Sequence, residues 1–354
     1  MNRQLEIYGT LGPSCADPAI LRQMFEKGIT GMRLNLSHGT LSDSEDLIAA
    51  FHKASAEVFG NGKRPSLLID MQGPELRIGT VSGKKVLGDG MEVRLCPKGS
   101  GQTGAGAIPV PGEIFDNYRN GMILMIDDGK IRLRAMEQGR AAEGPWIRAS
   151  VLTGGTLLSR KSIAVEGMTI TGSTLTEQDL WNLSKAESYG VTDVMQPFVR
   201  GALDLTAVRS AMQKAGAGNC RLFAKIENRQ GLAALDEILS GADMLVIARG
   251  DLGNAVPLWE LPRVQKEIAG KCLRRDVPFM VVTQMLASME KAPMPTRAEV
   301  SDIFNAVADG ASAVMITGES ASGRYPVEAS DYLVRTAQEA LRWKSGGSGP
   351  AGER

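Results

Sequence analysis

The chain has 354 residues, of which 43% are hydrophobic, so it is long enough to bury a large core in one or two domains. Its 40 basic and 40 acidic residues cancel and no basic run stands out, which argues against a nucleic-acid or membrane-surface partner. Four scattered cysteines and only two histidines exclude a zinc ribbon, a redox Cys-x-x-Cys motif and a histidine-based triad, so catalysis would have to use lysine, arginine, carboxylates, hydroxyls and metal.

Strand-like and helix-like segments alternate along most of the chain. Eight short runs rich in branched apolar residues are predicted strands: Glu6–Leu11, Met32–Asn35, Ser66–Asp70, Asp193–Gln196, Leu222–Ile226, Met244–Ala248, Phe279–Thr283 and Ala313–Thr317. Segments with helical periodicity separate most of them: Pro18–Lys27, Asp43–Val58, Glu177–Ser188, Gln230–Leu239, Leu261–Arg274, Arg297–Ala308 and Pro326–Leu341. The alternation predicts a parallel (β/α)8 barrel, the TIM barrel, formed by residues 1–79 and 173–344.

Residues 80–172 interrupt this alternation after the third strand. The segment is glycine-rich and carries short alternating runs at Met91–Cys96, Met122–Ile126, Ile131–Met136 and Trp146–Val151. We therefore expect an inserted, β-barrel-like all-β domain, and its position after a strand's carboxyl end suggests a lid. Residues 345–354 are rich in glycine and serine and are expected to be a disordered tail.

The segment Leu222–Gly253 carries the densest set of chemical groups. One predicted strand ends with Lys225 and Glu227, and the next releases Arg249 and Asp251. Because carboxyl ends of parallel barrel strands meet at one face, the two carboxylates are placed to share a hard divalent cation, with the lysine as a second positive charge. Such a pair suits a phosphoryl group or an enolate. The alternative is that these charges only neutralise one another as salt bridges at the barrel rim.

Other predicted strand ends carry polar groups as well. Arg33, Asn35 and Ser37 alternate so that their side chains point the same way. His38, which precedes a glycine, is either a turn residue or a ligand contact. Further groups follow the third, seventh and eighth strands: Asp70, Glu75, Arg77, Thr283 and Glu319. Polar groups at five strand ends predict one active-site face.

Together these motifs resemble pyruvate kinase from Gly9 to about Leu341. The matching segments are Thr10–Pro13 (TIGP in that family), Arg33–Gly39 (RxNFSHG), Asp70–Gly79 (DTKGPEIRTG), Asp127–Gly129 (DDG), Lys225–Asn228 (KIEN), Ala248–Gly253 (ARGDLG), Thr283–Leu286 (TQML) and Thr296–Glu299 (TRAE). The resemblance implies that the chain transfers a phosphoryl group between phosphoenolpyruvate and a nucleoside diphosphate, giving pyruvate and ATP.

The resemblance also implies a role for each matched residue. Glu227 and Asp251 would bind Mg²⁺ or Mn²⁺, while Arg33 and Lys225 would neutralise the transferring phosphoryl group, for which electrostatic stabilisation supplies most of the catalysis. The substrate carboxylate would be bound by the Gly250 and Asp251 amides and the Thr283 hydroxyl, with Thr283 near the face on which the enolate is protonated.

Potassium and nucleotide sites are implied in the same way. Potassium would be held by Asn35, Ser37, Asp70 and the Met71 carbonyl, and Glu75 occupies the position at which potassium-dependent members carry glutamate. Nucleotide would contact Asn35, His38 and Arg77.

Three departures from the family pattern concern positive charge. Gln72, Gln178 and Ser322 stand where the family carries lysine, on or near its nucleotide side. We therefore expect weak or redirected nucleotide binding. The family's carboxyl-terminal domain is not in this sequence, so we expect no sugar-phosphate control through it.

Two alternatives stay open at this point. A paralogue would keep the metal and enolate groups but act as another kinase, or as an aldolase or decarboxylase on a 2-oxo acid; a non-catalytic homologue would bind without turnover. In each case the expected partners are small molecules, and homo-oligomerisation is left open. The amino terminus lacks a signal-peptide pattern and no apolar run reaches ~18 residues, so we expect a cytoplasmic protein.

Overall fold

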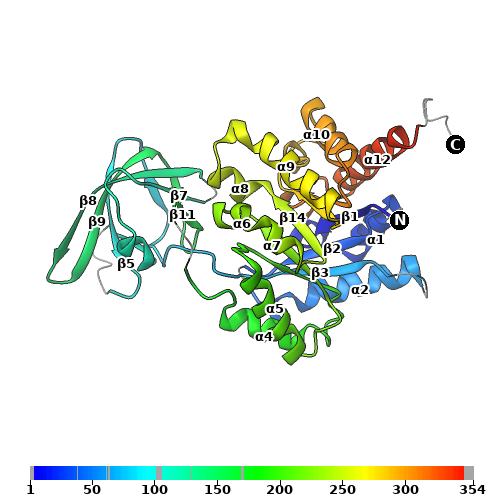
Figure 1. Ribbon diagram of the computed structural model, residues 1–354, viewed down its shortest axis with the longest axis horizontal. Coiled ribbons are helices and arrows are strands. Elements are labelled where there is room, and N and C mark those ends of the chain that lie inside the picture. Colours follow the sequence, from blue (N-terminus) through cyan, green and yellow to red (C-terminus); the bar gives the residue numbers. More distant parts are fainter. Residues whose placement is uncertain are drawn as a thin grey trace. The chain divides into compact units, whose positions relative to one another are not determined.

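The computed structural model describes residues 4–37, 39–60, 62, 64–100, 106–127, 129–168 and 171–346 (Figure 1). The chain forms two compact units. The barrel unit comprises Met1–Gly73, Ser173–Leu252 and Trp259–Arg354, and the insertion unit comprises Pro74–Gly172 with Gly253–Leu258. The units thus part between residues 73 and 74, whereas the sequence-based boundary lies between residues 79 and 80. Most of the expected tail, residues 347–354, lies outside the described residues.

Eight parallel strands close the barrel in the order β1-β16-β15-β14-β13-β12-β3-β2. Their bounds are β1 Glu6–Thr10, β2 Gly31–Asn35, β3 Ser66–Asp70, β12 Asp193–Gln196, β13 Arg221–Ile226, β14 Met244–Ala248, β15 Phe279–Val282 and β16 Ala313–Met315. The predicted TIM barrel is confirmed. One expected strand end differs: β15 stops before Thr283, because that residue has a φ of +77° and leaves the extended conformation.

Helices and short 3-10 turns alternate with these strands. They are η1 Pro13–Cys15, α1 Pro18–Lys27, η2 Ser42–Ser44, α2 Glu45–Phe59, α4 Glu177–Lys185, α5 Ala202–Lys214, α6 Arg229–Ala233, α7 Leu235–Leu239, α8 Arg249–Ala255, η3 Leu258–Glu260, α9 Leu261–Arg274, η4 Ala287–Glu290, α10 Arg297–Ala308, α11 Gly318–Ala321 and α12 Pro326–Lys344. Local sequence fixes several ends. In α1, for instance, Asp17 accepts from the Ala19 amide, and Gly28 adopts the left-handed conformation that ends the helix. Within the described residues, no helix is long and apolar enough to cross a membrane.

Two apolar layers stabilise the barrel unit. One layer lies between the strands and the surrounding helices and contains fully buried residues such as Leu222 and Leu333. The other fills the barrel interior and consists of Tyr8, Leu68, Met195, Phe223, Met244, Val246, Ala248, Met280, Val282, Ala313 and Met315. Packed layers of this kind make the interior a core and not a pore, so ligand chemistry is confined to the loops at the strand ends.

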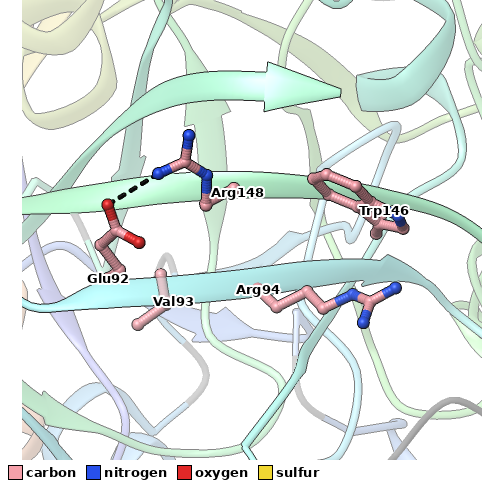
Figure 2. Close-up of a pocket in the computed structure, with 5 residues that line it drawn as sticks. All are labelled: Glu92, Val93, Arg94, Trp146 and Arg148. Atoms are coloured by element: carbon pink, nitrogen blue, oxygen red, sulfur yellow. Dashed lines mark hydrogen bonds and ion pairs between the residues drawn. The ribbon is translucent and has the colours of Figure 1, made fainter. Parts of the chain in front are cut away.

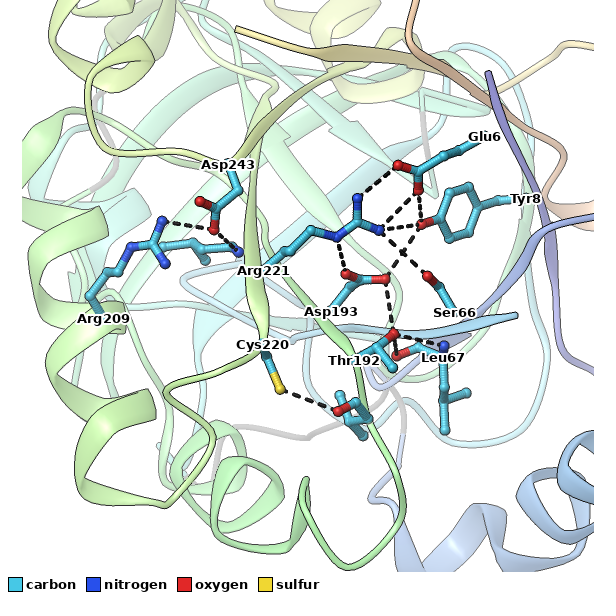
Figure 3. Close-up of polar contacts among 12 residues, drawn as sticks. Glu6, Tyr8, Ser66, Leu67, Thr192, Asp193, Arg209, Cys220, Arg221 and Asp243 are labelled. Carbon is cyan, nitrogen blue, oxygen red and sulfur yellow. Dashed lines mark hydrogen bonds and ion pairs between the residues drawn. The ribbon is translucent and has the colours of Figure 1, made fainter. Parts of the chain in front are cut away.

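A polar network closes the amino-terminal end of the barrel (Figure 3). Arg221, the first residue of β13, donates to Asp193 Oδ1 at 2.6 Å and to both carboxylate oxygens of Glu6 at 2.7 and 2.9 Å. Tyr8 donates to Glu6 at 2.7 Å and accepts from Arg221 at 3.0 Å. Asp193 is fully buried, so these contacts supply the partners that its charge requires.

The insertion unit contains two sheets. A six-stranded sheet has the order β11-β7-β8-β9-β5-β6, and a two-stranded sheet pairs β10 with β4. The elements are β4 Lys85–Leu87, β5 Glu92–Pro97, β6 Ile108–Val110, α3 Glu113–Asp116, β7 Ile123–Ile126, β8 Ile131–Ala141, β9 Gly144–Thr153, β10 Gly155–Leu157 and β11 Ile163–Val165. Its own apolar core, which includes Leu95, Leu124 and Ile147, accounts for its compactness.

Cross-strand pairs on β5 and β9 form a shallow pocket of about 320 Å³ in the insertion unit (Figure 2). Arg94 lies over the Trp146 ring, 5.2 Å from its centroid, and Arg148 pairs with Glu92 at 2.8 Å. Gly139 on β8 leaves room for the indole, since a Cβ there would lie 2.3 Å from Trp146 Cζ2. These contacts join β9 to its two neighbouring strands, β5 and β8.

Candidate functional site

Four charged side chains meet at the carboxyl end of the barrel. Arg33 of β2 donates to Asp70 Oδ2 through Nη2 at 2.6 Å and through Nε at 2.9 Å. Lys225 of β13 contacts the same oxygen at 3.3 Å and Glu227 Oε1 at 2.9 Å. Asp70 and Glu227 are buried and the two cations are largely so. The structure therefore joins Lys225 and Glu227, which are two positions apart, to Arg33 and Asp70 from two distant strands.

Lys225 remains a cation in this environment. Burial alone would lower the pKa of its ammonium group, but the charges of Asp70 and Glu227, with a further contribution from Asp251, outweigh burial and raise that pKa above its usual value. A lysine with a raised pKa is a poor general base at neutral pH. Such a lysine is suited to supply a fixed positive charge.

Asp70 keeps one oxygen unused. Its Oδ1 is buried and has no hydrogen-bond partner, whereas Oδ2 takes all the contacts with Arg33 and Lys225. A buried carboxylate oxygen without a donor is costly unless a cation or another group completes it. Asn35 on β2 is paired in register with Asp70, and its Oδ1 accepts from the Ser37 amide at 3.2 Å. Met71 is buried directly after β3.

Glu227 and Asp251 follow the neighbouring strands β13 and β14. The Phe198 amide donates to Glu227 Oε2 at 2.8 Å and thereby orients the carboxylate. Asp251 lies in the first turn of α8. No group of three or more histidine, cysteine, aspartate or glutamate side chains is arranged as a metal cage in the part of the chain that the structure describes. The donors present suit a cation that completes its coordination with substrate and water oxygens.

The turn after β15 places Thr283 beside Gly250. A Cβ on Gly250 would lie 3.1 Å from Thr283 Cγ2 and 3.8 Å from its hydroxyl oxygen. Any larger residue at position 250 would therefore crowd the threonine.

Two residues that sequence reasoning underused organise the loops around the site. Asp179, which was not singled out, accepts from the amides of Gln72 at 2.8 Å and Gly73 at 3.0 Å. It also forms a capping box with Thr176, and this Thr-x-x-Asp spacing was the available signal. Gln178 donates to the carbonyls of Leu36 at 3.0 Å and Gly39 at 2.5 Å, so its amide takes part in a loop contact.

Three other residues singled out in the sequence make contacts outside the cluster of four charged side chains. Arg77 pairs with Glu75 and donates to the Arg160 carbonyl at 2.9 Å, all within the insertion unit. Ser322 donates to the Gly318 carbonyl at 3.3 Å at the end of α11. His38 lies outside the described residues, as does Asp128 of the Asp127–Gly129 motif.

Comparison with known proteins places this chain in a family. The family model described as pyruvate kinase, barrel domain, matches residues 2–330. The chain belongs to the pyruvate kinase family. This membership confirms the resemblance read from the sequence motifs and agrees with the closed eight-stranded barrel.

Individual relatives in the pyruvate kinase family extend this result. The chain is 33% identical over 348 residues to a pyruvate kinase of Sporosarcina psychrophila, covering 97% of this chain and 58% of the relative. It is 37% identical over 346 residues to one of Agrobacterium vitis (97% and 69%) and 34% identical over 344 residues to one of Aeropyrum pernix (97% and 72%). The chain thus spans between 58% and 72% of the length of these pyruvate kinases.

Proposed function

We propose that this chain is a phosphotransferase that moves a phosphoryl group between phosphoenolpyruvate and a nucleoside diphosphate. The observation that carries the proposal is the joining of two largely buried cations, Arg33 and Lys225, to two buried carboxylates at the carboxyl end of the barrel. Phosphoryl transfer needs little covalent chemistry from the protein and depends on fixed positive charge around the phosphoryl oxygens. Membership of the pyruvate kinase family supplies the substrate class.

Glu227 and Asp251 are the proposed ligands of Mg²⁺ or Mn²⁺. The fit rests on their chemistry: two carboxylates at neighbouring strand ends match a hard cation that keeps coordination positions for substrate and water. When bound, the divalent cation would place further positive charge at the phosphoryl and enolate oxygens. Lys225 contacts Glu227, so its ammonium charge would lie beside the divalent cation.

Potassium is proposed at Asn35, Ser37, Asp70 and the Met71 carbonyl. The fit rests on Asp70 Oδ1, a buried oxygen without a donor. A monovalent cation with oxygen ligands would satisfy this atom. Glu75 supports potassium dependence only through the family resemblance.

Thr283, Gly250 and Asp251 are proposed to bind the carboxylate of phosphoenolpyruvate. The hydroxyl of Thr283 lies beside Gly250, whose lack of a side chain lets the two residues approach closely. The same hydroxyl is proposed to lie on the face from which the enolate receives its proton.

Nucleotide binding at Asn35, His38 and Arg77 stays a prediction from the resemblance. We propose that it is weaker than in ordinary members, because Gln72, Gln178 and Ser322 replace three lysines. Each lost charged contact to a polyphosphate removes about 1.5 to 3 kcal/mol when nothing replaces it. Gln178 retains a structural use, since it donates to the Leu36 and Gly39 carbonyls.

A coupled assay tests the proposal. Phosphoenolpyruvate is supplied with a panel of nucleoside diphosphates and Mg²⁺, with and without K⁺, and pyruvate formation is followed. We expect turnover that requires Mg²⁺, responds to K⁺ and disappears in Glu227→Gln and Asp251→Asn. Absence of pyruvate with every nucleotide would reject the phosphotransferase proposal. Aldol cleavage or decarboxylation of a 2-oxo acid in the same preparation would then favour a paralogue with the same metal and enolate chemistry.

A further inference from the structure

The turn after β15 has an unusual backbone. Thr283 has a φ of +77° and Gln284 a φ of +56°, so two consecutive residues other than glycine lie in the left-handed region. This region is least favourable for a β-branched residue such as threonine, whose side chain crowds the backbone there. A turn of this kind persists only when its surroundings hold it.

Arg249 holds the first residue of this turn. Its Nη2 and Nε atoms donate to the Thr283 carbonyl oxygen at 2.7 and 3.2 Å. The other edge of the guanidinium donates through Nη1 to Asp302 Oδ1 at 2.8 Å and lies 2.6 Å from Oδ2. A planar fork with donors on two edges can join a carbonyl and a carboxylate at once, which a lysine ammonium does less rigidly.

A second carboxylate holds the far side of the turn. Glu319 is buried and accepts from the Leu286 amide at 2.9 Å and from the Thr317 amide at 2.6 Å. The turn is therefore fixed at both sides by hydrogen bonds to charged groups. Such bonds are stronger than those between neutral groups, which explains how a left-handed threonine is retained.

We propose that Asp302 is a positioning residue that acts through Arg249 to keep Thr283 in the left-handed conformation. Asp302 lies on α10 and is partly exposed; its contact with the turn runs through the guanidinium. Removing its carboxylate frees Arg249 to rotate, and the Thr283 side chain then leaves its place beside Gly250. The catalytic consequence rests on the proposed function, in which the Thr283 hydroxyl acts on the substrate.

A double-mutant cycle tests this coupling. Asp302→Ala, Thr283→Ala and the double variant are compared in kcat for pyruvate formation. A lost charge-assisted contact predicts about a tenfold fall in kcat for Asp302→Ala. In the Thr283→Ala background the same change should alter kcat less than about twofold, because the residue through which Asp302 acts is already gone. Equal fold losses in both backgrounds would overturn the proposal.

Two further variants separate positioning from general damage. Asp302→Asn retains an acceptor for Arg249 and should restore most of the lost kcat. Asp309→Ala removes a carboxylate at the end of the same helix that pairs with Lys266, and should leave kcat unchanged. If Asp302→Ala does not fold, Arg249→Lys takes its place in the cycle, since it keeps the charge but loses the fork. An Asp302→Asn protein as impaired as Asp302→Ala would contradict the proposal.

Crystal structures keep this inference separate from the proposed function. A wild-type protein without turnover on phosphoenolpyruvate rejects the phosphotransferase proposal alone. In that case the φ of Thr283 decides the positioning role. Release of Thr283 from the left-handed region in crystals of Asp302→Ala, but not of Asp309→Ala, would support it. An unchanged Thr283 would overturn it.

Discussion

The two ends of the barrel carry similar charged groups with different degrees of pairing. At the amino end, Arg221 joins Asp193 and Glu6, and each carboxylate oxygen of the two acids accepts at least one hydrogen bond. At the carboxyl end, Arg33 and Lys225 both contact one oxygen of Asp70, and its other oxygen has no partner. The first network is complete without a ligand, whereas the second lacks a partner for a buried atom.

Positive φ values at residues other than glycine occur at both ends of the barrel, since Asp276, just before β15 at the amino end, has a φ of +51°. Phe198, Thr283 and Gln284 have positive φ values and follow β12 and β15 at the carboxyl end. The amide of Phe198 orients Glu227, and Thr283 lies beside Gly250. Such conformations cost free energy and are typically retained where they place functional groups. The comparison teaches that a buried atom without a partner, such as Asp70 Oδ1, distinguishes the proposed reactive end of the barrel from the structural one better than charge does.

The largest expected effect comes from Lys225→Met at the carboxyl end. The ammonium is proposed to interact most strongly when negative charge moves from the phosphoryl group to the enolate oxygen. Its loss should therefore lower kcat by roughly three orders of magnitude or more, with little change in the apparent affinity for phosphoenolpyruvate. Steady-state kinetics of pyruvate formation measure both quantities.

Lys266→Met is the matched control, because Lys266 is exposed and pairs with Asp309 on the outer surface. Its kcat should equal that of the wild type. If Lys225→Met weakened substrate binding and left kcat intact, the lysine would be only a binding residue. Catalysis by fixed positive charge would then no longer distinguish the carboxyl end from the amino end.

Arg221→Met should produce the reverse pattern at the amino end. Asp193 is buried and would lose its closest cationic contact, so we expect a loss of about 2 to 4 kcal/mol in the free energy of unfolding. This is below the full cost of breaking a buried pair because the guanidinium is 38% exposed. Under conditions in which the variant remains folded, its kcat should stay within about twofold of the wild-type value. Urea denaturation and steady-state kinetics of the same preparation test the two statements.

Arg209→Met provides the comparison for stability. Arg209 pairs with Asp243 at 2.8 Å near the same network (Figure 3). The side chains of both partners are more than a third exposed. An exposed pair contributes less than about 1 kcal/mol. A similar loss for Arg209→Met and Arg221→Met would mean that burial of Asp193 does not determine the strength of the network.

Much of the carboxyl-end site was predictable from the sequence. Parallel strands deliver their last residues to one face, so Arg33, Asp70, Lys225 and Glu227 could be assigned to one site once the barrel was predicted. The periodic segments also predicted most helices, although the span Gln230–Leu239 forms two short helices, α6 and α7, and α5 was not singled out.

Other features had no local signal. The pairing of Arg249 with Asp302 and Thr283 depends on how α10 packs near two strand ends, and the left-handed turn at Thr283 contains no glycine to announce it. The sequence shows Gln178 only as a glutamine where the family carries lysine, because its contacts with the Leu36 and Gly39 carbonyls join distant parts of the chain. Spacing within one segment carries no information on such contacts.

The smallest expected effect is a pH-dependent change in stability at the amino end. Burial, then the charges of Asp193 and Glu6, raise the pKa of the Tyr8 hydroxyl well above its usual value of 10.0. Below pH 10 both the folded and the unfolded protein keep the Tyr8 proton. Above pH 10 the unfolded chain loses it first, so the unfolded state binds fewer protons and the free energy of unfolding falls as pH rises, by up to about 1.4 kcal/mol per pH unit.

Tyr8→Phe removes this pH dependence of the free energy of unfolding, so a comparison with wild type shows its direction. At pH 8 the variant should be less stable than wild type by about 1 kcal/mol, because it loses the hydrogen bonds to Glu6 and from Arg221. By pH 11 the difference should close, since only the wild type loses stability through ionisation at position 8, while other tyrosines such as Tyr189 titrate in both proteins. Urea denaturation at several pH values from 8 to 11 measures the difference. A constant difference across that range would show that Tyr8 ionises as easily in the folded network as in the unfolded chain, which would contradict the view of the amino end as a closed set of paired groups.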